Sequence, residues 1–215
     1  MTATRRRRAG VLPKVGLVVE GDSEFLAFRR LNSQRLSPPW PPLDPVNLGG
    51  VGSDITPIGI AKRVAPKVIS HLIRGYSKVV VCFDREQRPE GPSTLAESVT
   101  KALAVELTVK GQSMQGVHIV VMNRAFEAWL LAGWPALRKA KKFVKDPKWM
   151  CFEGELGKEA KKGVVELDEL LGRPYRKTDD GPVLFCLLDF VAARDHGPGK
   201  AGSKSLDQFL RTIGI

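Results

Sequence analysis

The 215-residue chain is 43% hydrophobic and 27% charged, and its 34 Lys and Arg residues outnumber its 23 Asp and Glu residues, giving a formal net charge of +11. A chain of this length and apolar content is sufficient for one well-buried domain, or for one domain with a small extension. No apolar run approaches the roughly 18 residues that cross a bilayer, and the N-terminal stretch lacks the apolar core of a signal peptide. Composition therefore excludes membrane, secreted and wholly disordered classes, and we expect a cytoplasmic protein.

Two further features of the composition bear on function. The cysteines, at positions 82, 151 and 186, are odd in number and lack CxxC spacing, so they indicate neither a disulfide framework nor a zinc ribbon. An excess of cations most often serves polyanions such as nucleic acid, although a solvated basic surface is an open alternative. Arg5 to Arg8 lie in a stretch without apolar periodicity, which predicts a flexible basic tail over residues 1–12.

The next segments of the chain predict strand, helix and strand. The apolar run Val15 to Val19 is typical of a buried strand, and Asp22 to Leu31 has the amphipathic pattern of a helix. Ser37 to Pro45 is too rich in proline for a helix or a central strand, so we expect a surface loop there. A short strand at Val46 to Leu48 and a glycine-rich turn at 49–53 follow.

Two more pairs of elements complete an alternating pattern. A helix is expected from about Thr56 to Ile73, with a kink or break at Pro66, before the β-branched strand Lys78 to Asp84. A helix from about Ser93 to Lys110 then precedes the strand Val117 to Met122. The alternation predicts an α/β fold with a central, mostly parallel four-stranded sheet flanked by helices.

Beyond Asn123 the pattern becomes helical. We expect short helices near 125–132, 135–145, 164–171, 182–193 and 205–212. The predicted organisation is therefore a tail at 1–12, an α/β core at 13–133 and a C-terminal helical extension at 134–215 that packs on the core.

Acidic residues follow three of the predicted strands. Glu20 and Glu24 lie after the first, Asp84 and Glu86 at the third, and Glu127 just beyond the fourth. Ligands bind at the carboxyl ends of the strands in an open parallel sheet, and hard divalent cations prefer carboxylate oxygens. The pattern predicts a metal site, with the capping of helix N-termini as the alternative for any single acid.

These residues carry a family resemblance. The order strand, Glu20-Gly-x-Ser-Glu24, helix, followed about sixty residues later by a strand and Asp84-x-Glu86, resembles the Toprim domain of topoisomerases, primases and OLD-family nucleases. The resemblance implies that Glu20 supplies an acid, that Asp84 and Glu86 are metal ligands, and that Glu24 is the trailing acid. The third segment reads Asp-Arg-Glu where many Toprim proteins have Asp-x-Asp.

Later segments are similar to the DUF4276 and RloB-like proteins. Phe126-Glu127-Ala-Trp129-Leu-Leu-Ala132 looks like their FEaWLL segment, and the segments around Lys177, Arg194 and Ser205 also fit. The resemblance spans about Val15 to Leu210.

The resemblance implies a nuclease that requires Mg²⁺ or Mn²⁺. A carboxylate-bound ion activates water and stabilises the charge that develops on a scissile phosphate. Glu20, Asp84, Glu86 and Glu127 would hold the metal, with Glu20 as ligand or general base and Glu24 among the catalytic acids. Lys177 and Arg194 would stabilise the phosphate in the transition state.

Basic residues downstream predict a nucleic-acid surface, with a solvated helix face as the alternative. The candidates are Arg138, Lys139, Lys141, Lys142, Lys161, Lys162 and Arg176.

Three functions stay open at this stage. The first is a metal-dependent nuclease acting on RNA or DNA, and the resemblance adds a role in bacterial antiphage defence with an ABC-type or AAA-type ATPase partner. The second is a non-catalytic module of the same fold that binds nucleic acid or that partner. The third is a basic interaction protein whose acids only cap helices.

Overall fold

The protein was analysed as a computed structural model, which describes residues 12–34, 39–147, 161–196, 200 and 202–215. The predicted N-terminal tail lies outside this range apart from Leu12, and nothing is described of the side chains of Lys161 and Lys162. The chain forms four strands and helices in the α/β alternation expected from the sequence.

The sheet is four-stranded and entirely parallel, with the order β2-β1-β3-β4. Its strands are β1 (Val15–Val19), β2 (Leu43–Asn47), β3 (Val79–Asp84) and β4 (Val117–Met122). The predicted α/β fold with a parallel sheet is thus confirmed, and the architecture is consistent with a Rossmann-like fold.

Strand β2 begins earlier than the sequence suggests. It includes Pro45, which is opposite Leu17 of β1, in a segment that we expected to be a loop. Because β2 is an edge strand, the missing N–H of Pro45 removes no bond from the interior of the sheet. The prediction of a strand starting at Val46 was therefore wrong at its N-terminal boundary.

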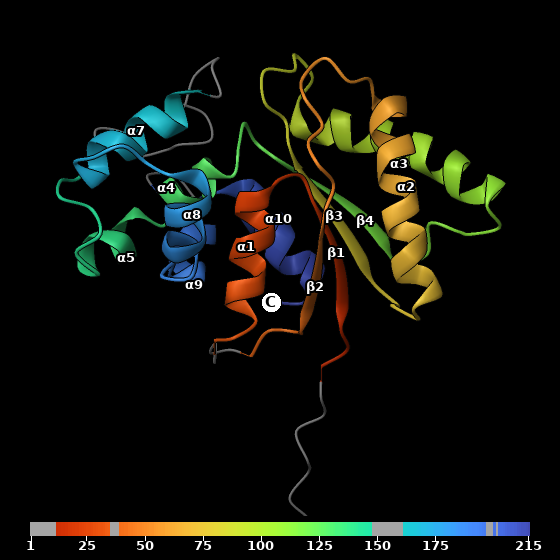
Figure 1. Ribbon diagram of the computed structural model, residues 1–215, viewed down its shortest axis with the longest axis horizontal. Coiled ribbons are helices and arrows are strands. Elements are labelled where there is room, and N and C mark those ends of the chain that lie inside the picture. The colour runs from red at the N-terminus through yellow and green to blue at the C-terminus, as the bar shows by residue number, and fades with distance from the viewer. Residues whose placement is uncertain (1–11, 35–38, 148–160, 197–199, 201) are drawn as a thin grey trace, which may run out of the picture.

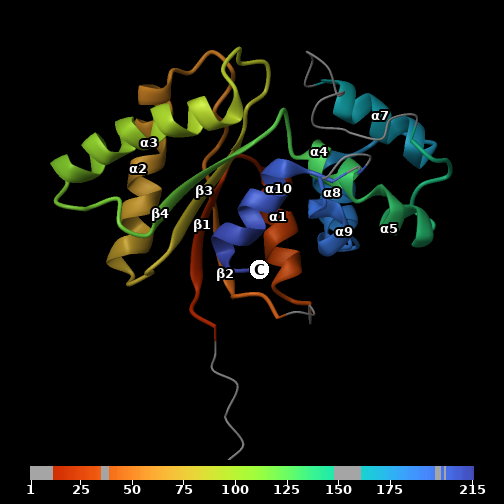
Figure 2. The same ribbon diagram turned by 180° about the vertical axis from the view of Figure 1, so that it is seen from behind.

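Helices cover both faces of the sheet (Figures 1 and 2). On one face α2 (Pro57–Ile73) and α3 (Pro92–Val109) pack against alternate strand residues such as Val81 and Phe83. The other face carries α1 (Asp22–Leu31) and α10 (Lys204–Ile213), which bury Leu17 and Val80. This continuous apolar content of the strands is what a parallel sheet buried on both faces requires.

The C-terminal helices share the core of the α1 face. They are α4 (Glu127–Ala132), α5 (Trp134–Lys139), α7 (Lys161–Leu171), α8 (Lys177–Phe185) and α9 (Phe190–Arg194). Phe185 of α8 contacts the rings of Phe28, Phe126 and Trp129, and Trp129 also contacts Phe209 of α10. One hydrophobic cluster therefore joins α1 and the sheet to the helical extension.

Several helix boundaries differ from those predicted. Helix α2 is continuous through Pro66, so of the predicted kink or break the break does not occur. The single helix expected at 182–193 is two helices, because Asp189 caps α9 by accepting hydrogen bonds from the N–H groups of Val191 and Ala192. Among the described helices, none has the length and apolar character needed to cross a membrane.

Candidate functional site

A cavity of about 340 Å³ opens at the carboxyl edge of the sheet, where β1 and β3 end side by side. The chain leaves β1 through α1 on one face and leaves β3 through α3 on the other. The crevice between two such strands is where open α/β sheets bind ligands. The lining residues are Glu20, Gly21, Asp22, Ser23, Glu24, Gly50, Asp84, Glu86, Glu127, Lys177 and Thr178.

Six residues selected from the sequence meet in this cavity. They are Glu20, Glu24, Asp84, Glu86, Glu127 and Lys177. They come from four separate parts of the chain, namely the β1–α1 segment, the end of β3 and the starts of α4 and α8, so only the fold brings them together. The structure thus places five predicted acids and one predicted cation around a single hollow.

Glu20 is held by the backbone of two loops. Its Oε1 accepts a hydrogen bond from the N–H of Val51 at 3.0 Å, and its Oε2 accepts one from the N–H of Asp84 at 2.8 Å. Burial raises the pKa of Glu20, although these two hydrogen bonds oppose the rise. Glu20 therefore ties β1 to the β2–α2 loop and to the end of β3, and each of its oxygens keeps a second lone pair for a ligand.

The surroundings of Asp84 and Glu24 disfavour the ionised form of both carboxyl groups. Burial raises the pKa of Glu24 to about 7, and the charges of Glu127 and Glu20 add to the rise. Burial and the charges of Glu24 and Glu20 hold the pKa of Asp84 well above its usual range. In addition, Asp84 Oδ1 is buried and has no hydrogen-bond partner among the described residues. The cluster thus favours protons or a cation.

Lys177 supplies one positive charge to the cavity. Its Nζ lies 3.3 Å from Oε1 of the buried Glu127, and the Ser23 hydroxyl donates to the Lys177 carbonyl at 2.9 Å, which fixes the start of α8 against α1. Burial lowers the pKa of Lys177, but the charges of Glu127, Asp84 and Glu24 outweigh it and raise the pKa. Lys177 is therefore a stable cation at the cavity wall.

Arg88, which is 5% exposed, was not among the residues predicted from the sequence to be functional. Its guanidinium donates to the carbonyls of Val51 at 2.8 Å and Gly52 at 2.6 Å, and to those of Asp84 and Arg85 at 3.2 Å. Arg88 and Glu20 therefore bind the same two loops, one through carbonyls and the other through N–H groups. No local pattern around Arg88 reveals contacts with a loop so distant in sequence.

The donor chemistry of the cavity fits a hard divalent ion, because its acids offer oxygen ligands and Asp84 Oδ1 lacks a partner. Over the ranges that the structure describes, however, no three His, Cys, Asp or Glu side chains form a group able to hold a metal ion. The carboxylates share a cavity without converging on one point. Binding a metal would therefore require their side chains to move closer together.

Arg194 does not line this cavity. Its Nε donates to Asp207 Oδ1 at 2.6 Å, and its Nη1 donates to the Ile215 carbonyl at 2.9 Å. Asp207 is 6% exposed and needs a counter-charge, which Arg194 and Arg211 provide. Arg194 thus joins α9 to α10, and its predicted contact with phosphate stays a prediction.

The predicted basic residues near α5 lie away from the cavity, whereas Arg176 directly precedes Lys177 of the cavity wall. Arg138 pairs with Asp146 at 3.1 Å and Arg176 pairs with Asp179 at 3.3 Å. Lys139 borders a separate hollow of about 550 Å³ that includes α9 residues, and Lys141 and Lys142 are exposed just after α5. Figures 1 and 2 show α5 on the side of the extension farthest from the sheet. None of these five residues lines the acidic cavity.

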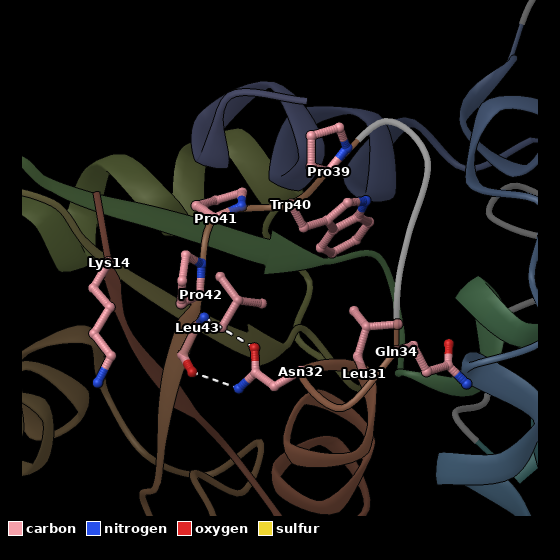
Figure 3. A pocket seen from close by; sticks show the side chains of 9 residues that line it. All are labelled: Lys14, Leu31, Asn32, Gln34, Pro39, Trp40, Pro41, Pro42 and Leu43. Atoms are coloured by element: carbon pink, nitrogen blue, oxygen red, sulfur yellow. Dashed lines mark hydrogen bonds between the residues drawn. The ribbon is translucent and has the colours of Figure 1, made fainter. Parts of the chain in front are cut away.

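A second hollow, of about 520 Å³, lies near the amino ends of β1 and β2 (Figure 3). Lys14, Leu31, Trp40 and Leu43 are among its lining residues. The side chain of Asn32 both donates to and accepts from the backbone of Leu43, which joins the end of α1 to the start of β2. Asn32 thus has a structural role, and the hollow lies at the opposite end of the strands from the acids.

Comparisons of the chain with protein-family models, with curated proteins and with solved structures found no match. The resemblance to Toprim and DUF4276 proteins therefore stands on the motifs alone. The case for a functional site depends on the geometry of the acidic cavity.

Proposed function

We propose that the protein is a nuclease that requires Mg²⁺ or Mn²⁺ and hydrolyses phosphodiester bonds of RNA or DNA. The observation that carries the proposal is the gathering of Glu20, Glu24, Asp84 and Glu127 in one cavity at the switch point of the sheet. The resemblance of the same acids to Toprim motifs supports it. Clustered acids with raised pKa values are also more common at functional sites than elsewhere.

The residues of the cavity would have different roles, according to their surroundings. Asp84, Glu86, Glu127 and Glu20 would hold the metal, which when bound supplies Lewis acidity and lowers the pKa of water. Glu24, whose pKa is about 7, is able to hold or release a proton near neutral pH. Lys177 stands at the cavity wall, where its ammonium group can stabilise a phosphate oxygen.

The biological setting of the proposal depends on the resemblance. We propose a cytoplasmic effector of antiphage defence that works with an ABC-type or AAA-type ATPase. The chain has no Walker motif, so ATP dependence would come from the partner.

A second function has one observation in its favour. Both carboxylate oxygens of Glu20 accept backbone hydrogen bonds, as expected of a residue with a structural role. A module of the same fold that binds nucleic acid or a partner without cleaving would need Glu20 for folding alone.

A cleavage assay separates the two. Labelled tRNA, single-stranded and duplex substrates are incubated with the protein in Mg²⁺, Mn²⁺ or EDTA, beside Asp84→Asn and the matched control Glu106→Gln on α3. We expect cleavage only with a divalent ion, a loss of about 100-fold or more in Asp84→Asn, and no change in the control. Cleavage that persists in Asp84→Asn would exclude this site, and binding without cleavage would favour the second function.

A further inference from the structure

Two arginines extend the sheet beyond β3 and β4. The N–H of Arg85 donates to the Met122 carbonyl at 2.9 Å, and the N–H of Glu86 donates to the Arg124 carbonyl at 2.8 Å. Arg85 and Arg124 thus follow β3 and β4, which are neighbouring strands (Figure 1). Their carboxyl edge also holds the acidic cavity. Both side chains are half-buried, and neither residue was among the candidates predicted from the sequence.

Among the described residues, the two guanidinium groups have no ion-pair partner and instead contact backbone carbonyls. Arg85 Nη1 donates to the Glu90 carbonyl at 3.3 Å, and Arg124 Nη1 donates to the Glu86 carbonyl at 3.0 Å. In the part of the chain that the structure describes, neither group forms an ion pair, and Arg85 Nε has no hydrogen-bond partner. Most of the five N–H donors of each guanidinium are therefore left for a ligand or for water.

The surroundings add more positive charge. The hydrogen bond from the Glu86 N–H to the Arg124 carbonyl brings the two segments together, and the charge of Arg124 adds to burial in lowering the pKa of Arg85. Arg85 also contacts the residue before Gly91, the N-cap of α3, where no side chain caps the helix and the first turn has no acidic residue. A cation at a helix N-terminus is unfavourable, whereas an anion there is stabilised. Two cations and a helix N-terminus thus lie close together, and neither guanidinium forms an ion pair with an acid among the described residues.

We propose that Arg85 and Arg124, beside the N-terminus of α3, bind a phosphate group of a nucleic-acid backbone. Neither arginine lines the acidic cavity, but Asp84 and Glu86, which flank Arg85 in the chain, do, so the proposal places a bound strand at the edge of the sheet that holds the carboxylates. The inference rests on the proposed function and specifies it, because it places the substrate across the ends of β3 and β4 and not over α5. Planar guanidinium groups suit bidentate contacts with phosphate.

The test measures binding without cleavage. Fluorescent single-stranded RNA and DNA oligonucleotides are titrated with protein in EDTA over a series of KCl concentrations, and anisotropy gives the dissociation constant. The variants are Arg85→Gln, Arg124→Gln and their combination, with Lys101→Gln on the exposed side of α3 as the control. Arg85→Lys and Arg124→Lys keep the charge, and thermal melts verify that each variant is folded.

We expect the double variant to bind at least about 10-fold more weakly at low salt, with a log–log salt slope shallower by roughly 1–2, and the lysine variants and the control to keep the slope. An unchanged slope in the folded double variant, or no binding by the unmodified protein, would overturn the inference. So would inorganic phosphate alone binding at micromolar concentration, because the site would then serve free phosphate.

The outcomes for the two proposals are distinguishable. Suppose the salt slope is shallower in the double variant but the protein cleaves no substrate with any metal. This result would support the phosphate site and reject the nuclease. Metal-dependent cleavage with an unchanged slope would reject the phosphate site alone.

Discussion

The acidic cavity raises the pKa of Glu24, one of the residues that line it. Its carboxyl group is 6% exposed, and burial beside Glu127 and Glu20 raises its pKa from 4.5 to about 7. A raised pKa means that the folded state holds a proton that the unfolded state releases, so stability falls as pH rises between those values. Such a cost is typical of residues kept for function.

Glu24→Gln removes that cost. We expect the variant to exceed the unmodified protein in the free energy of unfolding by about 3 kcal/mol at pH 8, with the difference vanishing near pH 4.5. Urea unfolding across this pH range measures the effect, and Glu106→Gln on α3 serves as the control. A variant no more stable at pH 8 than at pH 4.5 would contradict the account of Glu24.

At the scale of elements, Glu20 and Arg88 hold the β2–α2 loop against the end of β3. Glu20 accepts from the N–H groups of Val51 and Asp84, while Arg88 donates to the carbonyls of the same two residues. The buried carbonyls around Arg88 would lose their partners if its guanidinium were removed.

Arg88→Met is therefore expected to lower the free energy of unfolding by about 3 kcal/mol. Arg63→Met is a matched control, because the exposed Arg63 donates only to the Gly50 carbonyl at 2.9 Å, and we expect it to cost less than about 1 kcal/mol. Denaturant titrations of both variants give the comparison. Equal losses would show that Arg88 does not stabilise the loops as described.

The elements also show what local patterns can and cannot predict. The β-branched run of β3 and the acid at its end predicted a buried strand and a site residue, because both properties are local. The start of α8 at Lys177 was missed, since it depends on Ser23 holding the Lys177 carbonyl from α1. The role of Arg88 was missed for the same reason, since its partners include residues 51 and 52.

For the whole molecule, the extension and the sheet form one structural unit. Phe126 and Trp129 from the first part of the chain pack against Phe185 and Phe209 from the last part. The sequence predicted that the C-terminal helices pack on the core, but the extent of this shared aromatic cluster depends on tertiary contacts that no periodicity encodes.

Removal of residues 134–215 would therefore expose this cluster. We expect a chain ending at residue 133 to lose the cooperative unfolding transition of the full chain, because Phe126 and Trp129 would lose their aromatic partners. Circular dichroism melts and the dispersion of amide NMR signals would show it. A cooperative melt within about 5 °C of the full chain would contradict the shared core.

The central claim is that the acidic cavity binds a divalent cation, although its carboxylates do not converge in the described structure. Isothermal titration of Mn²⁺ into the unmodified protein, Asp84→Asn and Glu106→Gln tests this most directly. The account predicts saturable binding to the unmodified protein and Glu106→Gln, and binding at least about 10-fold weaker, or about 1.4 kcal/mol, in Asp84→Asn. No binding to the unmodified protein, or equal binding in Asp84→Asn, would contradict it.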